Sequence, residues 1–165
     1  MYERSQVETI DERMREFDNP LLQVVVGPRQ TGKSTMISQA LGRQKIESLY
    51  VSADDPIEPT VSWLRTEWQQ ARNMTRGNTR PVLLVIDEIQ KVKSWPNAVK
   101  SLWDEDRRTG SKLKVFLSGS SSLLLHRGLE DSLMGRFELI RSPHWSYGEC
   151  RDAFGYSLDD YLYYG

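Results

Sequence analysis

The sequence of 165 residues has few of the features that are typical of secreted or membrane proteins. It has a single cysteine, Cys150, which cannot close an intrachain disulfide, so nothing indicates a disulfide-stabilised secreted fold. The N-terminus runs into charged residues without the apolar segment of a signal peptide. No apolar run approaches the roughly 20 residues that a membrane span needs. We therefore expect a cytoplasmic protein without a membrane partner.

Neither basic nor acidic residues are in clear excess. The 22 basic residues are balanced by 23 acidic ones, giving a net charge of -1, so the chain as a whole has no attraction for nucleic acid or anionic lipid. One short loop is locally basic. We interpret this loop as a solvated turn, with contact to nucleic acid as the alternative, and its basic residues are Arg107, Arg108, Lys112 and Lys114.

With 38% hydrophobic residues, the chain can bury the core of one domain. Val7, Ile10 and Met14 recur at helical spacing, whereas Val82–Ile86 is apolar throughout, as in a strand covered on both faces. Further strands are predicted at 22–26, 48–52, 115–118 and 137–140, and further helices at 33–41, 61–71, 96–103, 149–154 and 158–164, with a broken helix over 123–134. This alternation predicts an α/β fold, a parallel sheet with helices on both faces.

The strongest motif lies between the first predicted strand and the helix after it. It matches G-x-x-x-x-G-K-S/T, the P-loop pattern, without a departure. A chance glycine-rich turn is the alternative, and the strand and helix around the motif argue against it. The predicted nucleotide-binding residues are Gly27, Pro28, Arg29, Gln30, Thr31, Gly32, Lys33, Ser34 and Thr35.

Each type of residue in this loop has a physical role in binding a triphosphate. The two glycines allow backbone conformations and space that side chains would block. Successive N–H groups then point at the phosphates from the positive end of the following helix. Lys33 brings a positive charge to the β- and γ-phosphates, Ser34 ligates magnesium and Thr35 reaches the α-phosphate. Arg29 and Gln30 occupy variable positions, so we give them no catalytic role.

Two carboxylates, Asp87 and Glu88, follow the apolar strand 82–86, at the sheet edge where α/β folds bind ligands. We interpret Asp87 as the acid that holds magnesium and Glu88 as the base that orients the attacking water. An ordinary strand end is the alternative. The strand 115–118 ends in Ser118, which we expect to sense the γ-phosphate, with Ser120 as a second choice.

Five stretches, in this order, resemble the AAA+ branch of prokaryotic ATP-binding proteins: GPRQTGKST, VSADDP, VIDEIQKVKSWPNAVKSLWDE, VFLSGSSSLLL and SLMGRFELI. The resemblance covers nearly the whole chain. It implies a five-stranded sheet in the order 5-1-4-3-2 and a helical lid after the last strand. The core would be residues 1–145 and the start of the lid or a linker 146–165. It also implies a longer protein, whose C-terminal domain is often described as nuclease-like.

The resemblance also marks Arg136, just before the fifth strand, as an arginine finger that reaches the nucleotide of a neighbouring subunit in a homo-oligomer. A surface arginine or an internal ion pair is the alternative. Where the family has a P-L-S turn after the fifth strand, this chain has SPHWS at 142–146. The family's lid arginine has one candidate here, Arg151.

Together these features predict an ATPase that binds ATP with Mg²⁺ and hydrolyses it to ADP and phosphate. We expect hydrolysis to drive a conformational change in a further domain or a partner. A nucleotide-gated switch with little turnover is one alternative, and a DNA-associated ATPase is another. The water-activating carboxylate pair argues against a phosphotransferase.

Overall fold

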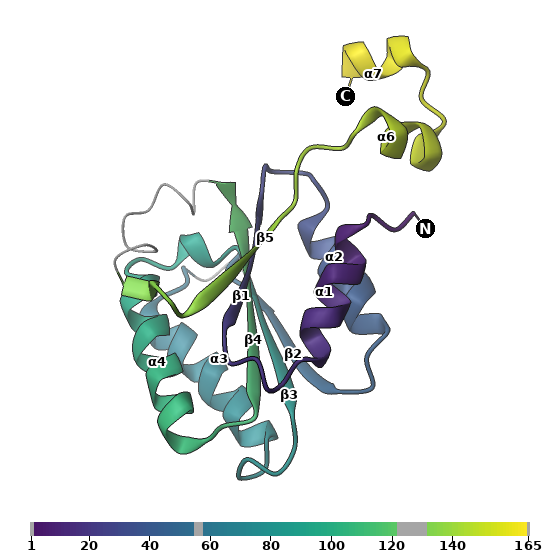
Figure 1. Cartoon of the computed structure of the whole chain (residues 1–165). Helices are drawn as coiled ribbons and strands as arrows, with labels where there is room; N and C mark the ends of the chain where they lie inside the picture. The colour runs from purple at the N-terminus through teal and green to yellow at the C-terminus, as the bar shows by residue number, and fades with distance from the viewer. Residues whose placement is uncertain (1, 55–57, 122–131, 165) are drawn as a thin grey trace.

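The fold is described for residues 2–54, 58–121 and 132–164 of a computed structural model (Figure 1). The broken helix predicted over 123–134 lies largely outside these residues. Among the described helices, none combines the length and apolar composition needed to cross a membrane.

In the described part of the chain, five parallel strands form one sheet in the order β2-β3-β4-β1-β5. Read from the β5 edge, this is the order 5-1-4-3-2, and the prediction is confirmed. The register pairs Val25 with Ser118 and Ser52 with Asp87, so the carboxyl ends of the central strands meet at one edge. The strands are β1 (Leu22–Gly27), β2 (Glu47–Ser52), β3 (Val82–Asp87), β4 (Leu113–Ser120) and β5 (Phe137–Arg141).

Helices cover both faces of this sheet, as Figure 1 shows. On one face lie α1 (Gln6–Arg15) and α2 (Lys33–Gly42), and on the other lie α3 (Val61–Met74) and α4 (Trp95–Thr109). A short 3-10 helix, η1 (Ile89–Lys91), follows β3. The two-sided cover explains why β3 is apolar at successive positions: Leu84 and Ile86 pack toward α3 and α4, whereas Leu83 and Val85 pack toward α1 and α2.

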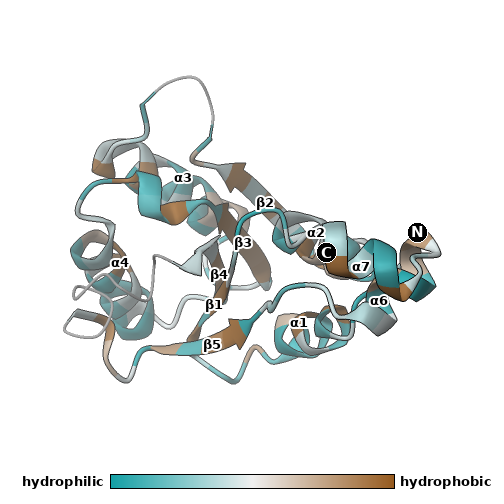
Figure 2. Ribbon diagram, turned by 90° about the horizontal axis from the view of Figure 1, so that it is seen from above, coloured by the Kyte–Doolittle hydropathy of each residue, from teal (hydrophilic) through white to brown (hydrophobic). Residues whose placement is uncertain are grey.

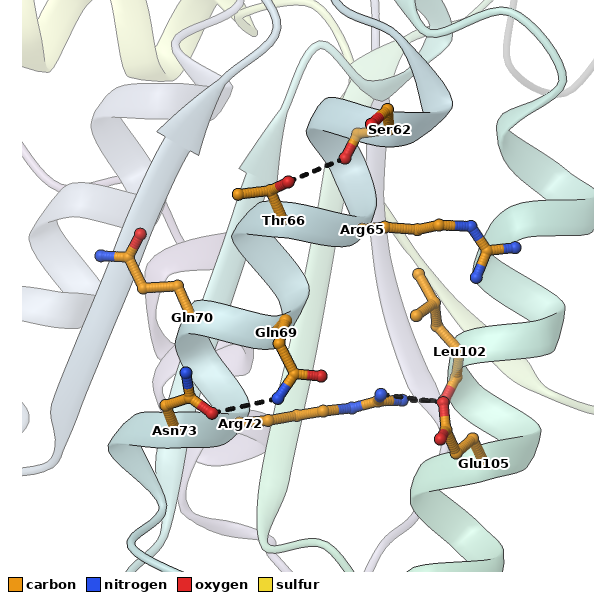
Figure 3. Close-up of a pocket in the computed structure, with 9 residues that line it drawn as sticks. All are labelled: Ser62, Arg65, Thr66, Gln69, Gln70, Arg72, Asn73, Leu102 and Glu105. Carbon is orange, nitrogen blue, oxygen red and sulfur yellow. Dashed lines mark hydrogen bonds and ion pairs between the residues drawn. The ribbon is translucent and has the colours of Figure 1, made fainter.

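Between α3 and α4, a buried carboxylate joins the two helices. Asp106 accepts hydrogen bonds from Trp68 Nε1 and Arg72 Nε, both at 2.7 Å. Burial raises the pKa of Asp106, although the two donors oppose this effect. Beside Arg72, the helices form an open polar groove of about 580 Å³, in which Arg72 reaches Glu105 and the Leu102 carbonyl (Figure 3). No residue of the predicted catalytic set lines this groove.

Beyond β5, the chain forms two further helices, α6 (Tyr147–Phe154) and α7 (Leu158–Tyr164). Seen from above, they lie over the side of the sheet that carries α1 and α2 (Figure 2). Ser146 and Glu149 form a capping box that fixes the start of α6. The side chains of Leu162, Tyr163 and Tyr164 on α7 are largely exposed. The division of the chain at 145/146 stays a prediction.

Candidate functional site

The P-loop connects β1 to α2 at the carboxyl edge of the sheet. Gly32 lies in the left-handed region, with φ 82°, and so does Gln30, with φ 62°. Gly27 is required for a different reason, because a Cβ atom there would lie 2.1 Å from the Ser142 carbonyl oxygen. The segment after β5 therefore packs directly on the first residue of the P-loop. From the sequence, we expected Gly27 to leave space for the ligand. The structure shows that its missing side chain leaves space for the backbone of Ser142.

Lys33 is buried, and its ammonium group folds back onto the loop. Nζ donates to the carbonyl oxygens of Pro28, at 2.7 Å, and Gly27, at 3.2 Å. Burial lowers the pKa of Lys33, and the carboxylates of Glu88 and Asp87 only partly oppose this effect. An anion in the loop would stabilise the charged ammonium, because it would provide a counter-charge that carbonyl dipoles cannot match.

Asp87 is the centre of the site and joins four segments. Its Oδ2 accepts hydrogen bonds from Ser34 Oγ, at 2.6 Å, and from the Tyr50 hydroxyl, at 2.7 Å. Its Oδ1 accepts from Ser118 Oγ and from the Glu88 backbone N–H. Burial raises the pKa of this carboxyl, but the hydrogen bonds from Ser118, Ser34 and Tyr50 outweigh burial and the pKa lies below its ordinary value. Asp87 is thus held ionised.

The oxygen atoms at this centre fit a magnesium ion. Mg²⁺ takes oxygen ligands and keeps several waters, so one or two protein ligands suffice. The Ser34 hydroxyl and the Asp87 carboxylate supply these oxygens from two elements, already within hydrogen-bond distance of each other. Ser34 is also on the open side of the site, where an ion and a phosphate have access.

Tyr50 belongs to the site, and sequence reasoning missed it. In β2, the alternate residues Leu49 and Val51 pack on the core shared with α3 and α4, which turns Tyr50 toward α2 and Asp87. Burial and, to a smaller extent, the hydrogen bond to Asp87 raise the pKa of the Tyr50 hydroxyl, so this hydroxyl remains a donor. One feature of the sequence indicated Tyr50. It lies between Leu49 and Val51 in a strand, so its side chain points to the opposite face from theirs, and this strand is next to the one that ends in Asp87.

Glu88 leaves the strand with a left-handed backbone, at φ 54°. This conformation is uncommon for a residue with a side chain and turns Glu88 away from the pleat of β3. Its Oε2 accepts a hydrogen bond from the Gln90 side chain. Glu88 therefore lies next to Asp87 with a partly exposed carboxylate, and Gln90 is a second neighbour that the sequence did not indicate.

Ser118 and Arg136 differ in where the structure places them. Ser118 is fully buried and its hydroxyl is directed at Asp87. Arg136 precedes β5, at the sheet edge opposite the P-loop, and forms an ion pair with Asp104 of α4, at 2.9 Å. Its guanidinium also lies 5.6 Å from the centre of the Trp103 ring. The structure thus contains the internal ion pair that was the alternative for Arg136, and its role as a finger stays a prediction.

Aromatic side chains enclose a space between the P-loop and α6. A cavity of about 310 Å³ is lined by residues from the N-terminus, α2 and the segment around α6, namely Tyr2, Arg4, Gly32, Thr35, Met36, Gln39, Trp145, Ala153 and Phe154. A neighbouring space of about 410 Å³ includes Arg29, Gln30 and Thr31 of the P-loop together with His144 and Tyr156. Arg151, the predicted lid arginine, is exposed and pairs with Asp152.

The comparisons with known proteins agree with this geometry. A family model for an AAA domain matches residues 19–151, and the chain belongs to this family. It is therefore a nucleotide-binding protein of the AAA+ class, as the sequence predicted. An uncharacterised protein of Methanocaldococcus jannaschii is 28% identical over 116 residues, which are 70% of this chain and 24% of that protein.

Two solved structures are similar in fold. Cdc6p from Pyrobaculum aerophilum has a TM-score of 0.67 at 15% identity. The Orc1 protein from Aeropyrum pernix, solved in complex with DNA, has a TM-score of 0.65 at 16% identity. Each match covers 90% of this chain and 47% of the other, so the chain spans about half the length of these structures and about a quarter of its archaeal relative.

Proposed function

We propose that this domain binds ATP with Mg²⁺ and hydrolyses it to ADP and phosphate. The observation that carries the proposal is the convergence on Asp87: the P-loop hydroxyl of Ser34, the strand-end hydroxyl of Ser118 and the backbone of Glu88 all bond to one carboxylate. A site for a triphosphate, a metal and a water needs these groups at one sheet edge.

Binding would rest on the P-loop residues. Lys33 has carbonyl partners that it can exchange for phosphate oxygens, a gain because a negatively charged acceptor attracts the ammonium group more strongly than a carbonyl dipole does. Gly32 and its neighbours supply N–H groups at the start of α2. Thr35 lines the aromatic cavity, where the nucleoside part of ATP would lie. Mg²⁺, when bound by Ser34 and Asp87, would neutralise charge on the β- and γ-phosphates.

Hydrolysis would rest on Glu88. Its carboxylate accepts a proton from a water molecule whose oxygen attacks the γ-phosphorus. The new P–O bond forms as the bond to the β–γ bridging oxygen breaks, which releases ADP and phosphate. Ser118 holds Asp87 from the buried side and so fixes the acid relative to the P-loop. We propose that turnover changes the position of a further domain or partner through the α6–α7 segment.

A nucleotide-gated switch with little turnover is the second candidate, and one contact favours it. Gln90 donates to Glu88 Oε2 and so competes with a water molecule for this carboxylate. A DNA-associated ATPase has less support. Lys114, one of the four basic residues of the predicted loop, lies in β4 instead, where it is buried and donates to the Asn19 carbonyl, so it is not available to a phosphate backbone.

Titration of the protein with a slowly hydrolysed ATP analogue and Mg²⁺ tests binding. Lys33→Ala should abolish most of the affinity, whereas Lys112→Ala, which removes an exposed lysine, should leave it unchanged. Equal affinities for the two variants would overturn the assignment of the site.

Phosphate release at saturating ATP separates an ATPase from a switch. Glu88→Gln should lower turnover by about 10²–10⁴-fold, the usual contribution of a general base, with binding retained. No turnover in wild-type protein that binds ATP would favour the switch. Loss of binding in Glu88→Gln would show that Glu88 is structural.

A further inference from the structure

Arg4 is a buried cation that the sequence did not single out. It precedes α1, is only 3% exposed and donates from all three guanidinium nitrogens. Nε and Nη2 bond to the two carboxylate oxygens of Glu149 in α6, at 2.8 and 3.2 Å. Nη1 donates to the Thr31 carbonyl of the P-loop, at 3.1 Å, and to Ser142 Oγ, at 3.3 Å. The remaining acceptors are the Pro143 and His144 carbonyls.

These partners belong to two regions that are far apart in the sequence: the P-loop, and the stretch 142–149, which contains the turn after β5 and the start of α6. The guanidinium also lies 5.0 Å from the centre of the Trp145 ring, a cation–π distance. A guanidinium offers these acceptors five N–H donors in a fixed fork, whereas a lysine ammonium offers three. Because an unpaired buried charge is costly, Arg4 is held at this position by its partners.

The contact with Thr31 affects the phosphate-binding side of the loop. In a planar trans peptide, the C=O and N–H bonds point in opposite directions. The Thr31 oxygen faces Arg4, so the N–H of Gly32 in the same peptide unit is directed away from Arg4. Arg4 therefore sets the direction of a donor in the P-loop, in addition to lining the aromatic cavity.

The contact with Glu149 carries the same constraint to α6. Glu149 Oε2 also accepts the Ser146 backbone N–H, at 2.8 Å, and so completes the cap of that helix. The aromatic cavity between the P-loop and α6 borders Arg4 directly. Any shift of the Thr31 peptide on nucleotide binding would thus reach the first turn of α6 through one guanidinium group.

We propose that Arg4 is a positioning residue that presents the Gly32 N–H to the phosphates and links the occupancy of the P-loop to α6 through Glu149. This inference rests on the proposed nucleotide binding. In this arrangement α6 is ordered more strongly when nucleotide is bound, and the N-terminal segment is part of the nucleotide-sensing apparatus. A purely structural ion pair would stabilise the fold equally with and without nucleotide.

The test compares Arg4→Lys, Glu149→Gln and the control Arg43→Lys. Arg43 likewise ties the N-terminal region to α2, through Glu3 and Glu8, but has no contact with the P-loop among the described residues. Two quantities are measured on folded protein: the Kd for the ATP analogue with Mg²⁺, and the slowing of amide hydrogen exchange over residues 146–154 when the analogue is added.

We expect Arg4→Lys to raise the Kd about 10-fold or more, the factor that corresponds to loss of a hydrogen bond to a charged group. The nucleotide-dependent protection of α6 should disappear in Arg4→Lys and in Glu149→Gln, whereas Arg43→Lys should behave like wild type. If Arg4→Lys does not fold, Glu149→Gln decides by its α6 protection.

Two results would overturn the inference in a wild-type protein that binds nucleotide: no protection of α6 on binding, or protection that Glu149→Gln and Arg4→Lys retain. An unchanged Kd in folded Arg4→Lys would remove the positioning role. Failure of the proposed function looks different, because wild type and Lys33→Ala would then both leave the analogue unbound.

Discussion

The close approach between Gly27 and Ser142 allows a quantitative test of how the P-loop is held. In Gly27→Ala, the new Cβ would lie 2.1 Å from the Ser142 carbonyl oxygen and 2.9 Å from its Cβ. Both obstacles are close to the backbone of a segment that is itself anchored, since the Ser142 N–H donates to the Val26 carbonyl at 2.7 Å. One of the two backbones must therefore move.

Overpacking of this kind costs about 1–3 kcal/mol and sometimes more. In a domain of this size, each kcal/mol lowers the melting temperature by about 2–4 °C, so Gly27→Ala should melt about 2–12 °C below wild type. Gly42→Ala is the matched control, because a Cβ at Gly42 meets no atom within 4 Å and the residue ends helix α2. Gly42→Ala should be neutral or more stable by up to about 1 kcal/mol.

Thermal unfolding followed by circular dichroism, with and without the ATP analogue, measures both effects. At 100 times its Kd, a ligand adds about 2.7 kcal/mol of stability, or about 5–11 °C here. Because the displaced backbone is the first residue of the P-loop, Gly27→Ala should also show a smaller ligand-induced rise than Gly42→Ala. The reasoning is refuted if Gly27→Ala melts within 1 °C of wild type, or if both alanine variants lose stability alike.

Three further predictions concern Tyr50, Lys114 and Arg136. Tyr50→Phe should weaken ATP binding about three- to tenfold, and only with Mg²⁺ present, because it removes about one net hydrogen bond from Asp87; an equal loss without Mg²⁺ would contradict this. Burial lowers the pKa of Lys114 to about 8, below its ordinary 10.5, so folding releases a proton at pH values between these two. Wild type should therefore gain stability relative to Lys114→Met as the pH rises from 7.5 to 10, measured by urea unfolding. A stability difference that does not change with pH would show that Lys114 is solvated, and the opposite trend would show that nearby carboxylates raise its pKa. Arg136→Ala should keep its nucleotide affinity but lose any rise of specific ATPase activity with protein concentration, and mixing with Lys33→Ala should partly restore activity; unchanged activity at all concentrations would leave Arg136 as the partner of Asp104 alone.

The sequence by itself determined the fold and was enough to propose the main residues of the candidate site. The apolar run at 82–86 has one stable environment, a strand between two helical layers, and the P-loop pattern needs a strand before it and a helix after it. These local requirements, with the resemblance to AAA+ proteins, were enough for the strand order and for the meeting of Ser34 with Asp87. Periodicity and motif spacing are properties of adjacent residues, which a sequence displays directly.

Only the tertiary structure decided which distant side chains complete the site. Tyr50 reaches Asp87 because β2 pairs with β3 in one register, and no pattern around Tyr50 encodes that register. Gly27 is required by Ser142, more than a hundred residues away. Arg4 is required by the P-loop and the stretch 142–149, which meet only in the folded chain. Such contacts depend on how helices and strands pack against each other. A single hydrogen bond or close approach between distant residues leaves no periodic pattern in the sequence. The sequence could therefore locate the P-loop and its acid, while the groups that hold them in place became visible only in three dimensions.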